Sequence, residues 1–272
     1  MGDKPRLPNY LALPQEVCTH GHTMSSVKLL LTSMLALTCT VGFSQCIAEE
    51  KMRYGGDFGV FNFTYFCPTY GFSYTGETSK TWSILNPIDI RQAENNVLST
   101  KAAIEREIIS YAGSNFFSQM KFSSVSVVYL DSIAKFKGRG PSVDMKMCKG
   151  RYFYYYYFQA EPKMAYCIGV AVDEQGKILS PFNFPSKHDY QPIDTTLTVC
   201  KVLELARKFN KKLGPIKEVT FEYNPSSKRF YWLVSEKIAR IHSGLNTYNQ
   251  VVIDAAEPKR IKAQTAQSMV SF

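Results

Sequence analysis

The sequence predicts an α+β fold in which two repeats of one unit each pack a helix on a small antiparallel sheet, after an N-terminal aromatic-rich hairpin. Two amphipathic helical stretches alternate with short stretches rich in aromatic and β-branched residues, which favour strands. The order helix, strand, hairpin occurs twice, at about 90–179 and about 194–261, and this predicts duplication of a small unit. The composition, 45% hydrophobic and 20% charged, is that of a folded protein with an ample core.

The N-terminal residues predict export. Residues 24–45 carry a single lysine and an apolar run of about a dozen residues that ends among small residues, which is typical of a signal peptide. Because the run is shorter than the roughly 20 apolar residues of a spanning helix, we expect cleavage, after Ser44 or after Ala48, and no stable membrane span. We interpret residues 1–23 as a non-native extension upstream of the true start. The protein is therefore expected to be periplasmic or secreted.

Residues 46–86 are rich in glycine and aromatic residues. Their large side chains fall into two runs, from Phe58 to Phe66 and from Tyr70 to Tyr74, on either side of a Cys-Pro-Thr break. This arrangement predicts two short strands joined by a turn, as an added hairpin or a flap.

The first unit is predicted at residues 87–180. The pair Asn86-Pro87 suits a helix start, because asparagine caps helices and proline fits their first position. Apolar residues then recur at spacings of three and four until Gly113, which predicts a helix that packs on a sheet. Strands are predicted at 121–130 and around 143–148, and a hairpin follows.

That hairpin, at 151–179, is expected in the middle of the sheet and carries a run of consecutive aromatic residues. Side chains alternate between the two faces of a strand, so one set should be core. The other set, if nothing covers it, would form a strip able to stack on sugars or anchor a protein. The alternative is that the N-terminal hairpin or the second unit covers it. The two sets are Tyr152, Tyr154, Tyr156 and Phe158 on one face, and Phe153, Tyr155 and Tyr157 on the other.

From this run we take as candidate binding residues three tyrosines and the two basic residues beside them: Tyr152, Tyr154, Tyr156, Arg151 and Lys149. The second arm of the hairpin, from Met164 to Val172, alternates large with small side chains. One of its faces should therefore be bulky, and the other should let a neighbouring segment approach closely.

A linker with three prolines leads to the second unit, predicted at residues 193–262. The cluster Asp194-Thr195-Thr196 predicts a helix start, and Gly214-Pro215 predicts its end. Strands are predicted at 216–223, 230–234 and 250–254. We expect the tail after Ile261 to fray.

Similar short motifs close the two units. Val172-Asp173 precedes Gly176-Lys177-Ile178-Leu179, and Val251-Val252-Ile253-Asp254-Ala255 ends the second unit. In these motifs the chain resembles the PepSY family, small modules of one helix on a three-stranded antiparallel sheet that occur in peptidase propeptides and exported bacterial proteins. The likeness covers about 90–261, and the chain departs from the pattern by an insertion at about 131–150 and by Glu257-Pro258, where the family has a glycine. The resemblance implies an inhibitory or binding module rather than an enzyme.

No catalytic or metal-binding motif stands out. Neither Cys-x-x-Cys nor His-x-x-x-His occurs, and the sequence has no Gly-x-Ser-x-Gly and no phosphate loop. We therefore expect no catalytic residue, metal or cofactor. Asp173 and Asp254, at matching strand ends, are expected to accept hydrogen bonds from turn N–H groups.

The cysteines leave disulfide pairing open. Export permits disulfides, yet the spacings are wide and the number that remains after cleavage at Ser44 is odd. Cys167, in a predicted strand, and Cys200, in a predicted helix, fit small buried hydrophobic residues.

Two function classes follow. The first is an exported non-enzymatic module that binds a protein in the envelope or outside the cell and inhibits or regulates it, a peptidase being one case. The alternative is binding of a glycan or cell-envelope polymer through the tyrosine-rich strand face. The net charge of +9 either suits an anionic partner or serves solubility alone, and export makes nucleic acid the least favoured partner.

Overall fold

The computed structural model describes residues 46–60, 63, 70–74, 78–80, 90–128, 149–236, 240–242 and 245–269. The predicted extension and signal peptide, the strand around 143–148 and the Asn86-Pro87 helix start lie outside these ranges. Among the helices described, none combines the length and the apolar composition of a membrane span.

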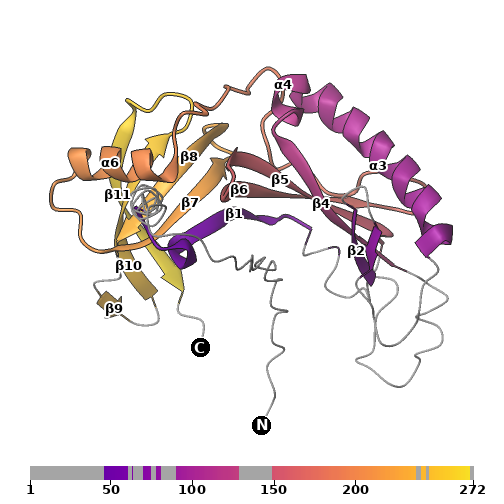
Figure 1. Cartoon of the computed structure of the whole chain (residues 1–272), viewed down its shortest axis with the longest axis horizontal. Helices are drawn as coiled ribbons and strands as arrows, with labels where there is room; N and C mark the ends of the chain where they lie inside the picture. The colour runs from indigo at the N-terminus through magenta and orange to yellow at the C-terminus, as the bar shows by residue number, and fades with distance from the viewer. Residues whose placement is uncertain are drawn as a thin grey trace, which may run out of the picture. The chain divides into compact units, whose positions relative to one another are not determined.

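The strands form one mixed, 11-stranded sheet in the spatial order β11-β10-β8-β7-β1-β6-β5-β4-β2-β3, with β9 paired to β10 (Figure 1). The strands are β1 (Met52–Phe58), β2 (Tyr70–Tyr74), β3 (Thr78–Lys80), β4 (Met120–Val127), β5 (Tyr152–Glu161), β6 (Met164–Val172), β7 (Ile216–Asn224), β8 (Arg229–Glu236), β9 (Arg240–His242), β10 (Leu245–Asp254) and β11 (Ile261–Met269). The helices are η1 (Glu49–Lys51, a 3-10 turn), α3 (Ile90–Ala112), α4 (Ser114–Phe117) and α6 (Val199–Phe209).

The predicted fold of two repeats, each with a helix on its own small antiparallel sheet, is wrong. Strand β1 lies between β6 and β7 and runs parallel to both, with Gly55 opposite Tyr166 of β6 and Tyr54 opposite Phe221 of β7. It joins the antiparallel strands on either side into a single sheet. Parallel pairing of this kind joins segments far apart in the chain, so local patterns do not reveal it.

The predicted N-terminal hairpin is also wrong. Strand β1 pairs with β6 and β7, whereas β2 pairs with β3 and β4. Of the two aromatic runs, Phe58 lies in β1 and residues 70–74 form β2, while Phe61, Tyr65 and Phe66 lie outside the described residues.

Two glycines allow the close fit of β1 between its neighbours. A Cβ atom on Gly55 would lie 1.8 Å from the carbonyl oxygen of Phe221, and one on Gly169 would lie 2.4 Å from the carbonyl oxygen of Phe58. Both distances are far inside van der Waals contact, so neither position can carry a side chain without displacing backbone. The predicted small face of β6 is thus confirmed as a face of close approach.

The helices cover one face of the sheet. In Figure 1, α3 and α4 lie over β4 and β5, and α6 lies on the same side over β7 and β8. A single core cluster contains Val97 of α3, Val202 of α6 and the large side chains of β6 from Met164 to Val172. The bulky face predicted for β6 is therefore the core face.

A stack of phenylalanine rings lies at the centre of this core. The ring centroids of Phe116 and Phe158 are 4.5 Å apart, those of Phe158 and Phe230 are 4.6 Å apart, and those of Phe230 and Phe221 are 5.2 Å apart. The rings come from α4, β5, β8 and β7. Because β5 and β8 are four places apart in the sheet, a flat sheet would hold them roughly 19 Å apart. The sheet therefore curves around the stack.

Two predicted boundaries in the second half need correction. Helix α6 is capped by Thr198, whose Oγ1 accepts a hydrogen bond from the Lys201 N–H, whereas Asp194 accepts one from the Thr196 N–H in the turn before it. Residues 261–269, predicted to fray, instead form β11, which pairs with β10 along its whole length.

A disulfide joins Cys46 to Cys200, 154 residues later. The interpretation of Cys200 as a buried hydrophobic residue is wrong, since it is exposed and paired, whereas Cys167 is buried and free. Cleavage after Ala48 would remove Cys46 and with it the disulfide. Cleavage at the other predicted site, after Ser44, would keep Cys46.

Candidate functional site

The predicted binding tyrosines lie mainly in the core. Tyr154 and Tyr156 expose 0% and 1% of their surface, and the Tyr154 hydroxyl donates a hydrogen bond of 2.8 Å to the Val97 carbonyl of α3. Burial raises the pKa of both phenols. Tyr152 is half-buried and packs against the same core. A binding role for Tyr154 and Tyr156 is incompatible with this burial.

The two basic candidates lie at the start of the same strand. Lys149 is exposed, and Arg151 is half-buried with its Nη2 atom 3.9 Å from Glu174. These cations therefore lie beside tyrosines that α3 covers. The structure does not assemble the five predicted residues into one accessible site.

The opposite face of β5 carries a second set of aromatic side chains, which meets β1. The ring centroids of Tyr54 and Tyr157 are 5.2 Å apart, those of Phe58 and Tyr155 are 5.0 Å apart, and those of Phe58 and Tyr157 are 5.8 Å apart. We call Tyr54, Phe58, Tyr155 and Tyr157 the β1 aromatic cluster. Tyr54 exposes 47% of its surface, and the other three are half-buried. Phe58 and Tyr155 also pack against a second buried cluster that contains Phe153 and Ala171, so Tyr54 is the exposed member of the group.

Two acidic residues lie near β1. The Gly56 N–H donates a hydrogen bond of 3.0 Å to Glu222 of β7, and Asp57 is exposed. Burial, opposed by the Gly56 hydrogen bond, raises the pKa of Glu222, and the charge of Asp57 raises it further. Burial and these two carboxylates raise the pKa of the Cys167 thiol to about 12. A thiol in this state stays protonated at neutral pH and is a poor nucleophile.

The raised pKa of Glu222 predicts a pH-dependent stability difference for Glu222→Gln. The folded-state pKa exceeds the unfolded one, so the contribution of Glu222 is most favourable below the unfolded pKa and is lost as pH rises through the folded pKa. Glutamine does not ionise and keeps an oxygen that can accept the Gly56 hydrogen bond. We expect the urea midpoint of the variant to exceed that of the wild type at pH 7, and the excess to shrink at pH 4. An excess that is constant between pH 4 and 7 would contradict the assignment.

The matching aspartates are confirmed as turn acceptors. Asp173 accepts hydrogen bonds from the Gln175 and Lys177 N–H groups at 3.0 and 2.8 Å. Asp254 accepts them from Ala256 and Glu257 at 2.9 and 3.0 Å.

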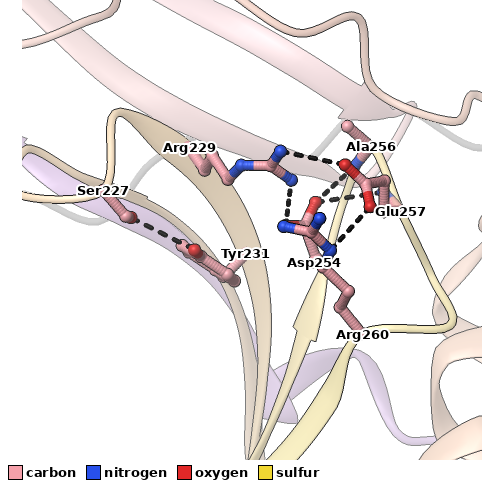
Figure 2. A network of polar contacts seen from close by, with 7 residues as sticks. All are labelled: Ser227, Arg229, Tyr231, Asp254, Ala256, Glu257 and Arg260. Atoms are coloured by element: carbon pink, nitrogen blue, oxygen red, sulfur yellow. Dashed lines mark hydrogen bonds and ion pairs between the residues drawn. The ribbon is translucent and has the colours of Figure 1, made fainter.

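Figure 2 shows the wider network around the second turn. Arg229 donates to Asp254 and to Glu257, and Arg260 bonds the other Glu257 oxygen. Asp254 exposes only 2% of its surface, and its charge is compensated within the network. The network holds the β10–β11 turn against β8, and its role is structural.

A groove of about 490 Å³ lies where the end of α6 faces β10 and β11. None of the lining residues is aromatic: Asn210, Asn249, Gln250, Val251, Ala263, Gln264 and Thr265. Side chains alternate between the two faces of a strand, so Gln250 and Gln264, which lie opposite each other, point away from the face that carries Val251 and Ala263. On that other face Gln264 donates to Gln250 at 2.8 Å, and Gln250 donates to Ser235 at 3.1 Å.

No family model, no curated protein and no solved structure matches this chain. Within the described ranges, no group of three or more His, Cys, Asp or Glu side chains is placed to hold a metal ion. Sequence reasoning found the aromatic run of β5 and the alternative that the N-terminal segment covers one of its faces. Phe58 of that segment does pack against Tyr155 and Tyr157, but Tyr54 was not singled out. The signal that pointed to Tyr54 and Phe58 was the aromatic content of residues 46–86, which we had assigned to a separate hairpin.

Proposed function

We propose that the chain is an exported, non-enzymatic binding module that regulates a protein of the cell envelope or the extracellular space, such as a peptidase. The observation that carries this proposal is the β1 aromatic cluster, in which Tyr54 exposes 47% of its surface. Tyrosine is enriched at protein interfaces because it offers a large rigid contact area with a polar tip. A partner would cover Tyr54 and the half-buried rings beside it.

The geometry favours a protein partner over a glycan or envelope polymer. Sugars stack on aromatic rings, and none of the residues that line the groove beside α6 is aromatic. The tyrosine face on which a glycan site was predicted includes Tyr154 and Tyr156, which are in the core. The rings of the β1 aromatic cluster lie on strands of a sheet, and a sheet face suits a broad contact with a protein.

The Cys46–Cys200 disulfide supports export. Such bonds persist in the periplasm and outside the cell and are rare in the reducing cytosol. Together with the predicted signal peptide, this pairing favours a protein that folds after it has left the cytoplasm.

Replacing Tyr54 by Ala tests the proposal. The chain from Gln45 onward, which keeps Cys46, is used as bait in cell-envelope extract, and a captured protein is then purified for affinity measurements. We expect Tyr54→Ala to weaken binding of that protein by about tenfold or more, as at interface hot spots. The matched control is Tyr111→Ala, because Tyr111 exposes 39% of its surface and lies on α3, on the opposite side of the sheet. Equal binding by both variants, or retention of polysaccharide alone, would overturn the proposal.

A further inference from the structure

Strand β11 presents a long open edge. It pairs with β10 on one side, and in the part of the chain that the structure describes no strand pairs with its other side. Its sequence, Ile-Lys-Ala-Gln-Thr-Ala-Gln-Ser-Met, contains no proline and a single charged residue, Lys262. The residues from Lys262 to Thr265 are all exposed. Natural sheets usually protect such edges with charges, prolines or bulges, because the unpaired N–H and C=O groups bind other strands.

The groove lies beside this edge. Ala263 and Thr265 of β11 line it together with Asn249 and Val251, their partners on β10, and with Asn210 at the end of α6. Because alanine and threonine are short, they leave the outer strip of the sheet open toward α6. Alternate side chains of a strand added to β11 would lie next to Ala263 and Thr265 and enter the groove.

The segment around Asn210 is strongly basic. The cations of this segment are Arg207, Lys208, Lys211 and Lys212, all exposed. Among the described residues, none of them lies within ion-pair distance of a carboxylate, whereas Lys201 on the same helix pairs with Glu204. Arg207 and Lys208 also interact favourably with the C-terminal dipole of α6, but Lys211 and Lys212 lie beyond the helix end. Phe209, in the same segment, exposes 48% of its surface.

We propose that β11 binds an extended acidic peptide segment of a partner protein as an additional strand. The backbone of the segment bonds to the open edge of β11, alternate side chains enter the groove, and its carboxylates lie near Lys211 and Lys212. This inference rests on the proposed function, because it takes the chain to be a protein-binding module. It adds that the bound segment of the partner is extended and acidic. The site is separate from the β1 aromatic cluster.

The open edge favours a peptide over other anionic ligands. A row of backbone donors and acceptors at strand spacing is matched by another strand. An acidic polysaccharide or an anionic lipid surface would satisfy the lysines but would leave these edge groups to water. The basic segment then selects acidic strands among the peptides that could pair.

The test uses the chain from Gln45 onward and a fluorescent nine-residue peptide that alternates Glu with Val, as long as β11. We expect saturable binding, and slower hydrogen exchange of β11 amides in the complex. A peptide with Lys in place of Glu, and one with alternate residues replaced by Pro, should both bind about tenfold more weakly or not at all. Absence of binding, exchange protection confined to other strands, or equal binding of the proline peptide would overturn the proposal.

Variants near the groove and away from it test where the peptide binds. The double change Lys211→Glu and Lys212→Glu should weaken binding by about tenfold, and Ala263→Trp, which fills the groove, should abolish it. The matched controls are Lys177→Glu, an exposed lysine in the turn after β6, and Lys262→Trp, the neighbour of Ala263 on the face of β11 away from the groove. Both controls should stay within about twofold. Binding that is lost in both controls, or kept in both test variants, contradicts the site.

The two proposals fail in different ways. If an acidic polysaccharide or vesicles of anionic lipid bind at the basic segment and the peptide does not, the strand-addition proposal is wrong. The capture experiment with Tyr54→Ala then still decides the proposed function. If Tyr54→Ala and Tyr111→Ala bind the captured partner equally while the acidic peptide protects β11, the aromatic contact is wrong and the edge site stands.

Discussion

Replacing Cys46 or Cys200 by Ser should lower the free energy of unfolding by about 4 kcal/mol. The disulfide closes a loop of 154 residues, and a cross-link over a long loop removes much of the conformational freedom of the unfolded chain. The disulfide also links the segment before β1 to α6, one of the helices that lie on one face of the sheet.

Urea unfolding of the chain from Gln45 onward, with and without reductant, measures this loss. Reduction of the wild type should reproduce the effect of either substitution. The control is Cys167→Ala, which removes the free buried thiol without breaking a cross-link and should cost about 1 kcal/mol. If Cys200→Ser and Cys167→Ala lowered stability equally, the cross-link would not contribute as expected.

Phe158→Ala is expected to be the most damaging core substitution, at about 4 kcal/mol. Phe158 is fully buried, and its ring lies between those of Phe116 and Phe230 at 4.5 and 4.6 Å. Removing it leaves a cavity in the middle of the stack, where three strands and a short helix meet. The surrounding backbone is held by the sheet and cannot collapse far into that space.

Chemical unfolding monitored by tryptophan fluorescence provides the measurement, because Trp232 packs against Phe221 in the same stack. Phe209→Ala is the control, since it removes the same ring from a position that is 48% exposed. We expect the control to change stability by about 0.5 kcal/mol or less. A loss below about 1 kcal/mol for Phe158→Ala would mean that the stack relaxes around the missing ring.

Local pattern was enough to predict the hairpins of this fold. Strands β5 and β6, and strands β7 and β8, are joined by short turns. The alternation of side chains along the strands and the turn residues between them therefore lie next to each other in the sequence. Helix α3 ends at Ala112, beside the glycine expected to stop it. In each case the residues that form the element are also the residues that specify it.

Strand β1 could not be predicted in this way. Met52–Phe58 contains two adjacent glycines and reads as a poor strand. Its glycines are required by β6 and β7, whose backbones approach it from both sides. Those strands lie more than 100 residues further along the chain, so the need for glycine appears only in the assembled sheet.

The candidate surfaces were predictable only in part. The aromatic run of β5 was evident, but both of its faces carry large rings, so a period of two does not tell which face the helices cover. The edge at β11 was missed because Ala, Gln, Thr and Ser give an exposed strand the composition of a tail. Residues 261–269 form a strand because they pair with β10, and composition alone did not indicate this pairing.

The central place of β1 sets the order in which the molecule can be assembled. Strand β1 is made early, yet its two hydrogen-bonding neighbours end at Val172 and Asn224. Whether the chain leaves the ribosome or passes N-terminus first through an export pore, the first strand must wait unpaired until most of the polypeptide has emerged. The two halves of the sheet can therefore be joined through β1 only after Asn224 has been made, while β8 to β11 are still to follow.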